Sequence, residues 1–112
     1  MTTYEKTEIE ERLAQDLPTW RLEDDSLTRT YETGGWRLTL MLANAIGFVA
    51  EAAYHHPTLT LGYSQLTVQL ISHDAGGITE RDFALAARIE TLATWQPADD
   101  DVLPGYPEAW IT

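Results

Sequence analysis

The stretch of residues 36–54 constrains the fold most, because its pattern predicts one long helix that is apolar almost all round. Its polar members Arg37, Asn44 and Glu51 are spaced seven residues apart, and Thr39 is the only other one. Seven residues turn a helix by roughly 700°, nearly two full turns, so these three side chains form one narrow stripe. A helix with so little polar surface needs more than one buried face. We therefore expect one side to cover a sheet and another to meet a second copy of the chain, in a homodimer or homotetramer.

Strands are predicted on both sides of this helix, where apolar and polar residues alternate. Residues 19–33 alternate around the turn-forming segment EDDS, and residues 58–73 alternate before and after Gly62. Alternation interrupted by turn residues is typical of paired antiparallel strands. The sequence therefore predicts two strand pairs, one before and one after the long helix.

Two further helices are predicted near the ends of this arrangement. Thr7 and Glu10 have the spacing of a capping box, and apolar residues at helical spacing follow over about residues 8–17. Thr79 and Asp82 have the same spacing at the start of a last helix.

The resulting order, αββαββα, predicts an α+β domain in which helices pack on one face of a four-stranded antiparallel sheet. We assign residues 1–95 to this domain. Residues 96–112 read as an irregular acidic tail, because Pro, Gly and Asp are frequent there.

Charge and cysteine content exclude several function classes. The chain has 18 Asp and Glu against seven Lys and Arg, a net charge of −11, which opposes binding to nucleic acid or to an anionic membrane. No apolar window approaches the roughly 18 residues of a membrane helix, and no signal pattern is seen, so we expect a cytoplasmic protein. The absence of cysteine removes disulfides, thiolate nucleophiles and cysteine zinc sites.

All three histidines of the chain lie in one short region. His55 and His56 are adjacent at the end of the long helix, and His73 follows the last predicted strand. On a helix that reaches residue 55, Glu51 and His55 would share a face, so the carboxylate could orient the imidazole. Pro57 disfavours helical geometry for His56, so the two adjacent rings can point in different directions.

The residue types alone leave three interpretations of this cluster open. The histidines could be unrelated surface or hydrogen-bonded residues. They could form a tri-histidine zinc site completed by a water molecule. They could also perform general acid/base catalysis, because imidazole exchanges protons near neutral pH.

The spacing of the polar positions in this region resembles the signature of the pterin-4a-carbinolamine dehydratases, also called 4a-hydroxytetrahydrobiopterin dehydratases. The matching positions are Glu51, His55, His56, Pro57, Tyr63, His73 and Asp82. The segment GGITERDFALAARIE is similar to the loop and last helix of that family. The resemblance covers about residues 10–95, and members of the family have the αββαββα order.

The resemblance implies dehydration of a 4a-hydroxytetrahydropterin to the quinonoid dihydropterin, without a metal or an organic cofactor. It implies that the motif histidines surround the pterin, with His55 and His73 as proton donors to the 4a-hydroxyl group and His56 chiefly as a binding residue. Glu51 would orient His55 or accept the N5 proton.

The remaining motif positions receive supporting roles under the same resemblance. Arg81 and Asp82 would support His73 from the start of the last helix. Tyr54 stands where many members carry Asp or Asn, at the mouth of the site, and would contact the substrate. We expect Trp36 in the core and Tyr63 as a packing residue on a strand.

A second functional class is compatible with the same family. Some members act without catalysis, as a dimerization cofactor of a homeodomain transcription factor or as a Rubisco assembly factor. The intact set of three histidines favours the enzyme.

Overall fold

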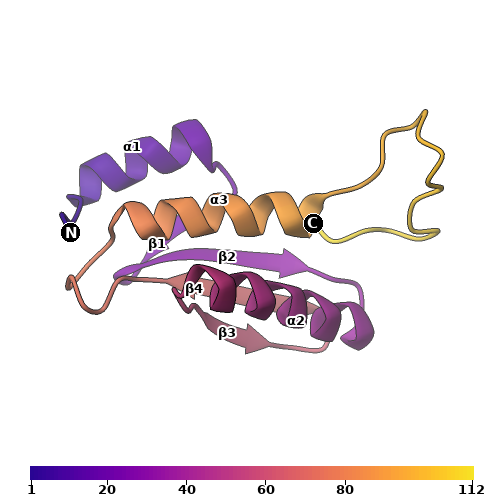
Figure 1. The fold of residues 1–112 in the computed structure, drawn as a ribbon, viewed down its shortest axis with the longest axis horizontal. Helices are drawn as coiled ribbons and strands as arrows, with labels where there is room; N and C mark the ends of the chain where they lie inside the picture. The colour runs from indigo at the N-terminus through magenta and orange to yellow at the C-terminus, as the bar shows by residue number, and fades with distance from the viewer.

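The computed structural model describes residues 1–112 and contains seven helices and strands in the predicted order (Figure 1). Their bounds are α1 Lys6–Asp16, β1 Arg21–Glu23, β2 Ser26–Glu32, α2 Trp36–Ala53, β3 Thr58–Leu61, β4 Gln65–Leu70 and α3 Glu80–Thr94. The αββαββα prediction is confirmed. None of the three helices has the length and apolar character that a membrane span requires.

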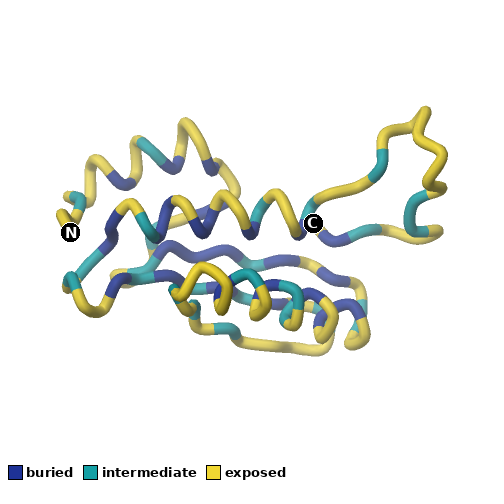
Figure 2. The backbone as a smooth tube through the Cα atoms, in the orientation of Figure 1, coloured by how far each residue is buried: buried dark blue, intermediate teal, exposed yellow.

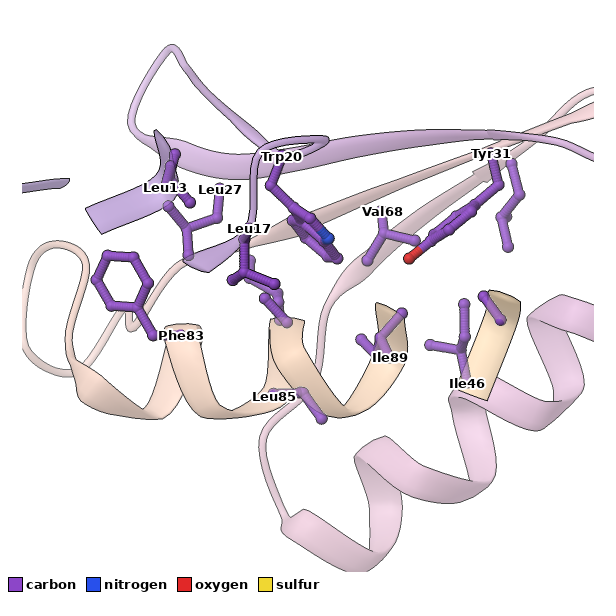
Figure 3. Close-up of a cluster of buried hydrophobic side chains, with 14 of the residues drawn as sticks. Leu13, Leu17, Trp20, Leu27, Tyr31, Ile46, Val68, Phe83, Leu85 and Ile89 are labelled. Atoms are coloured by element: carbon purple, nitrogen blue, oxygen red, sulfur yellow. The ribbon is translucent and has the colours of Figure 1, made fainter. Parts of the chain in front are cut away.

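The four strands form one antiparallel sheet in the order β1-β2-β4-β3. In its central pair, Leu27 is opposite Leu70 and Tyr31 is opposite Leu66. Side chains two residues apart on a strand share a face, so these apolar residues line one side of the sheet. Figure 3 shows Leu27 and Tyr31 pointing toward the helices that carry Ile46, Phe83 and Ile89, which are α2 and α3.

One hydrophobic core holds the sheet and the three helices together (Figure 2). α1 contributes Ile9 and Leu13, α2 contributes Ile46, and α3 contributes Phe83 and Ile89. All five side chains are buried. Because one face of the sheet and one face of each helix supply this core, the α+β layer prediction is confirmed.

The start of α1 differs from the prediction. Glu5 is the residue before the first helical turn, and its backbone N–H donates to the Glu8 carboxylate at 3.0 Å. Thr7 lies inside the helix, so the predicted cap at Thr7 and Glu10 is wrong. The chain is already anchored just before this point, because the Tyr4 backbone N–H donates to the C=O of Ile78 at 2.9 Å.

Two aromatic residues also lie elsewhere than predicted. Trp36, expected in the core, begins α2 and is 46% exposed. Tyr63, expected on a strand, lies in the turn between β3 and β4 and is 74% exposed. Its backbone C=O, rather than its ring, makes a structural contact, accepting a hydrogen bond from Thr39 Oγ1 at 3.1 Å.

A polar cluster connects α3 to the sheet and to the end of the chain. The Glu90 carboxylate accepts hydrogen bonds from Trp20 Nε1 at 2.9 Å, Tyr31 Oη at 2.7 Å and Arg29 Nε at 3.1 Å. Burial, and then the bond to Glu90, raise the pKa of Tyr31. Burial also acts to raise the pKa of Glu90, but the bonds from Arg29 and Tyr31 outweigh it, so this pKa is lowered.

Residues 95–112 contain no helix or strand. Figure 1 shows them projecting past the end of α3 and then returning to it. The return is held by Ile111, which is buried in the core, and by Thr112, whose backbone C=O accepts from Arg29 at 2.7 Å.

Candidate functional site

The turn after α2 sets the directions of the adjacent histidines. Tyr54 ends the helix in the left-handed conformation, with φ 53°, and the His55 backbone N–H donates to the C=O of Ala50 at 3.1 Å. This bond closes a turn of the kind that usually contains glycine. Pro57 then removes a backbone donor and favours extended geometry for His56. His55 and His56 therefore leave the helix end on different sides.

His55 pairs with a carboxylate that is distant in the sequence and lies at the start of α3. Its Nε2 lies 2.6 Å from Oδ1 of Asp82, the third residue of α3. The predicted pairing of His55 with Glu51 is wrong, because α2 ends at Ala53 and His55 lies beyond it. The side chain of His55 is 12% exposed and that of Asp82 is fully buried.

Asp82 is fixed by two further donors on its second oxygen. Oδ2 accepts from Ser72 Oγ at 2.8 Å and from the Thr79 backbone N–H at 2.8 Å. The second of these bonds belongs to the predicted capping box of α3, which is confirmed. With Oδ2 occupied by these two donors, Oδ1 is the oxygen that faces His55. In the tautomer in which Nε2 donates to Oδ1, Nδ1 is left for proton exchange.

His56 contacts Glu51, the carboxylate that was predicted to pair with His55. Its Nε2 lies 2.8 Å from Glu51 Oε1, and both side chains are more than half exposed. The Tyr54 ring meets the His56 ring edge-to-face, with their centroids 5.5 Å apart. His56, Glu51 and Tyr54 thus form a solvent-facing group at the end of α2.

His73 lies in the exposed turn after β4, and its predicted partners contact other residues. Arg81 NH2 donates to Oδ1 of Asp74 at 2.7 Å, and Asp82 contacts His55, so neither of these side chains contacts His73 directly. The Arg81–Asp74 bond lowers the pKa of Asp74 and raises that of Arg81. Arg81 is therefore bonded to Asp74, the residue after His73 in the same turn.

A cavity of about 430 Å³ lies between the C-terminal part of α2 and the first half of α3. His55, Arg81 and Arg88 are its polar lining residues, and five apolar residues form the remaining walls. This volume is within the range of small-molecule sites, roughly 300–1,000 Å³. Neither His56 nor His73 lines it. The structure thus brings one of the three histidines into this cavity, together with two guanidinium groups.

No group of three or more His, Cys, Asp or Glu side chains is arranged to hold a metal ion. The tri-histidine zinc alternative therefore finds no ligand set among these side chains.

Two contributors to the site were missed by the sequence reasoning. Ser72 follows β4 and is fully buried against Asp82, and no local pattern distinguishes it from an ordinary turn serine. Arg88 could have been found, because it follows Arg81 by seven residues and therefore shares its helix face.

Comparison with known proteins connects this geometry to one family. The sequence model of the family described as "Pterin 4 alpha carbinolamine dehydratase" matches residues 2–92. A Chloroflexus aurantiacus protein named "Putative pterin-4-alpha-carbinolamine dehydratase" is 40% identical over 92 residues, which cover 82% of this chain and 98% of that protein. A Thermomicrobium roseum protein of the same name is 42% identical over 82 residues, or 73% of this chain and 88% of that protein.

Solved structures share the fold at lower identity. A transcriptional coactivator/pterin dehydratase from Brucella melitensis has a TM-score of 0.75 at 24% identity, covering 82% of this chain and 99% of that one. A pterin dehydratase-like RuBisCO assembly factor of the alpha-carboxysome has a TM-score of 0.57 at 24% identity, covering 68% and 90%. At this identity the likeness concerns the fold.

Proposed function

The chain belongs to the pterin 4 alpha carbinolamine dehydratase family, and from this premise we propose that it dehydrates a 4a-hydroxytetrahydropterin to the quinonoid dihydropterin. The reaction class is that of a hydro-lyase. The observation that carries the proposal is the buried Asp82 carboxylate, which holds His55 at the wall of a cavity of about 430 Å³.

The reaction needs two proton transfers and no change of oxidation state. The C4a–O bond breaks, the departing hydroxyl group takes up a proton and leaves as water, and the N5 proton is lost to a base. An imidazole whose second nitrogen is held by a carboxylate can perform either transfer, because it accepts a proton as the free base and donates one as the cation. In the proposal, His55 protonates the leaving hydroxyl group, and Asp82 holds the imidazole ring in the orientation for that transfer.

The other motif residues are assigned around this centre. His73 is proposed as a second proton donor, for the opposite face of the ring, and His56 as a binding residue. Glu51 lies 2.8 Å from His56, so in the proposal it orients His56 rather than His55, or accepts the N5 proton. Tyr54 extends the same exposed group toward the substrate.

Arg81 and Asp82 are proposed as positioning residues. Asp82 acts on His55 directly, at 2.6 Å. Arg81 acts on the His73 turn through Asp74, at 2.7 Å.

The enzyme proposal is tested by the decay of 4a-hydroxytetrahydropterin in stopped-flow absorbance. We expect the native chain to accelerate the decay over the spontaneous reaction, and His55→Gln and His73→Gln to lower the acceleration about 10²- to 10⁴-fold, the usual contribution of a general acid. Arg21→Gln is a control, because Arg21 is exposed and bonds only to Glu23. A native chain that leaves the spontaneous rate unchanged would refute the proposal.

The second candidate is a non-enzymatic, protein-binding member of the family. The exposed apolar side chains of α2 are the feature that favours it, since Met41 is half exposed and Phe48 is 77% exposed. The stopped-flow experiment separates the two, because a purely protein-binding chain would not change the decay rate.

We also propose that α2 forms a homodimer or homotetramer interface. Leu38, Leu42 and Ile46 face the core, whereas Met41 and Phe48 are exposed on the other side of the same helix. Covering such residues is favourable by about 25 cal/mol per Å² of apolar surface. Light scattering of the native chain and of Phe48→Glu tests this: we expect an oligomer for the first and a smaller species for the second. A native monomer at micromolar concentration would contradict the interface.

A further inference from the structure

The cavity beside His55 has a second feature that proton transfer does not use. Arg81 and Arg88 both line it, seven residues apart on α3. A helix rises about 1.5 Å per residue, so the two side chains start roughly 10 Å apart along one face. Both therefore lie along a single groove that begins at His55 and continues along α3.

Arg88 has no acidic partner, unlike four other arginines of the chain. Arg12, Arg21, Arg29 and Arg81 each form an ion pair with an Asp or Glu side chain. Arg88 makes no hydrogen bond or ion pair, although the chain carries 18 acidic residues. Its positive charge is therefore uncompensated by any direct partner, at the edge of a cavity.

Arg81 also retains unused hydrogen-bonding capacity. NH2 is occupied by Asp74, but Nε is buried and has no acceptor. A buried donor without a partner is costly, typically about 1–3 kcal/mol, and such groups usually have a role or a missing partner. The groove thus contains one free guanidinium group and one that is only partly satisfied.

Small side chains line the cavity between these cations. Ala52 and Ala53 of α2 face Ala84 of α3 across the cavity. Alanine side chains leave the space between the helices open, and they offer no polar group of their own. An elongated ligand could therefore lie between His55 and Arg88 with its charged end at Arg88.

We propose that this groove binds an anionic substituent, a carboxylate or a phosphate, on the side chain of the pterin. This inference rests on the proposed dehydratase function and specifies its substrate class: a pterin whose ring lies at His55 and whose acidic side chain reaches Arg88. Guanidinium groups suit these anions because their donors match two oxygens at once. The overall charge of −11 repels anions, so the local cations select where on the surface an anion can bind.

Binding of oxidised pterins tests the inference independently of catalysis. Isothermal titration calorimetry compares a neutral ligand, 6-hydroxymethylpterin, with two anionic ligands, pterin-6-carboxylate and the phosphate ester of 6-hydroxymethylpterin. We expect the native chain to bind at least one anionic ligand about tenfold more tightly than the neutral one, as one charge-assisted contact would give. The two anionic ligands show whether the groove takes a carboxylate, a phosphate or both.

Variants of Arg88 test whether the groove causes the preference for anionic over neutral pterins. Arg88→Gln should reduce the ratio of anionic to neutral affinity to about one, and Arg88→Lys should restore part of it. The Arg21→Gln control removes the same charge from β1 and should keep the native ratio. The selectivity of the native chain should also fall as salt is raised from 0.05 to 0.5 M, values chosen to span strong and weak screening.

The outcomes distinguish this inference from the proposed function. If the native chain accelerates dehydration but binds neutral and anionic pterins equally, the anion groove is wrong and the enzyme proposal stands. If no pterin binds and no acceleration is seen, both are wrong. If Arg88→Gln changes the oligomeric mass and leaves the selectivity ratio as in the native chain, the groove meets an acidic surface of a second copy instead, and the inference is overturned.

Discussion

His55 Nε2 lies 2.6 Å from Asp82 Oδ1, although the two residues are separated by 27 positions in the sequence. The contact joins the end of α2 to the start of α3, and it places one titratable ring against a carboxylate that is otherwise surrounded by donors. Because Asp82 is also part of the α3 cap, the same side chain begins a helix and orients the proposed acid. Stability and activity should therefore be linked at this position.

Asp82→Asn is expected to impair both properties. The Thr79 backbone N–H must keep an oxygen as its acceptor, so the new amide N–H₂ would face His55. His55 Nε2 must then accept a hydrogen bond, so the ring cannot carry a proton on both nitrogens and cannot donate as the cation, as the proposal requires. We expect a stability loss of about 1–3 kcal/mol and a fall in the dehydration rate of at least about tenfold. Urea unfolding and stopped-flow decay measure the two effects.

The rate per folded molecule separates orientation from simple loss of folding. In the proposal, Asp82 orients His55, so Asp82→Asn should lower the rate per folded molecule at a temperature where circular dichroism shows the variant to be fully folded. Asp16→Asn on α1 provides a carboxylate control, because it removes only an exposed pair with Arg12. A native rate per folded Asp82→Asn molecule would mean that Asp82 acts only as a cap.

The element order was accessible from the sequence because its signals are local. The apolar period of residues 36–54, the alternation of the strands and the cap of α3 each depend on neighbours within a few positions. The partner of His55 was not accessible in this way. One left-handed residue, Tyr54, ends α2 before His55, so the contact of Glu51 moves to His56 and His55 becomes free to reach Asp82.

The distribution of cations is a second case in which sequence alone is insufficient. Arg81 and Arg88 look alike on the helical pattern of α3. Asp74 pairs with Arg81, and no carboxylate pairs with Arg88. That difference follows from the path of the turn after β4. Long-range pairing of this kind has no short-range signal, so Arg88 was not singled out.

Tyr54→Gly is predicted to stabilise the chain. A left-handed conformation costs a non-glycine residue about 1–2 kcal/mol, and glycine adopts it without this cost. The Tyr54 ring is mostly exposed, so little burial is lost with it. We expect a gain of about 0.5–1 kcal/mol in the free energy of unfolding, measured by urea denaturation.

Tyr63→Gly is the matched comparison for this substitution. Tyr63 is also an exposed tyrosine in a turn, but it is not among the residues with positive φ. Glycine at position 63 relieves no backbone strain, and it raises the conformational entropy of the unfolded chain. The free energy of unfolding should therefore fall. Equal effects at both positions would show that the left-handed turn at Tyr54 stores no strain.

Glu90→Gln is expected to be strongly destabilising. Glu90 is the carboxylate partner of Arg29, whose side chain is almost fully buried. Removing one member of such a pair leaves a buried charge uncompensated, which costs about 3–5 kcal/mol; the amide keeps some hydrogen bonding, so about 2–4 kcal/mol is expected. Thermal unfolding should show a fall in Tm of roughly 8–16 °C. Glu10→Gln on the exposed side of α1 should change Tm little, and a similarly small effect at Glu90 would contradict the assigned role.

The Arg12–Glu80 pair makes part of the stability dependent on acid pH. Hydrogen bonds from Arg12 and then Tyr4 lower the pKa of Glu80 to about 2, from an ordinary value of 4.5. A carboxyl group with a lowered folded-state pKa stabilises the fold fully above its unfolded value, and this contribution disappears as the pH falls from about 4.5 to about 2. Since Glu80 is half exposed, solvent screening limits the contribution to under about 1 kcal/mol.

Urea unfolding of the native chain and of Glu80→Gln between pH 7 and pH 2.5 measures this contribution. The native chain should be the more stable one at pH 7, and the difference should shrink continuously below pH 4.5, because protonated Glu80 resembles glutamine. Glu11→Gln, on the exposed surface of α1, should give no such pH-dependent difference. If the gap between native and Glu80→Gln chains stayed constant down to pH 2.5, the ion pair that joins α1 to α3 would not be the source of the lowered pKa.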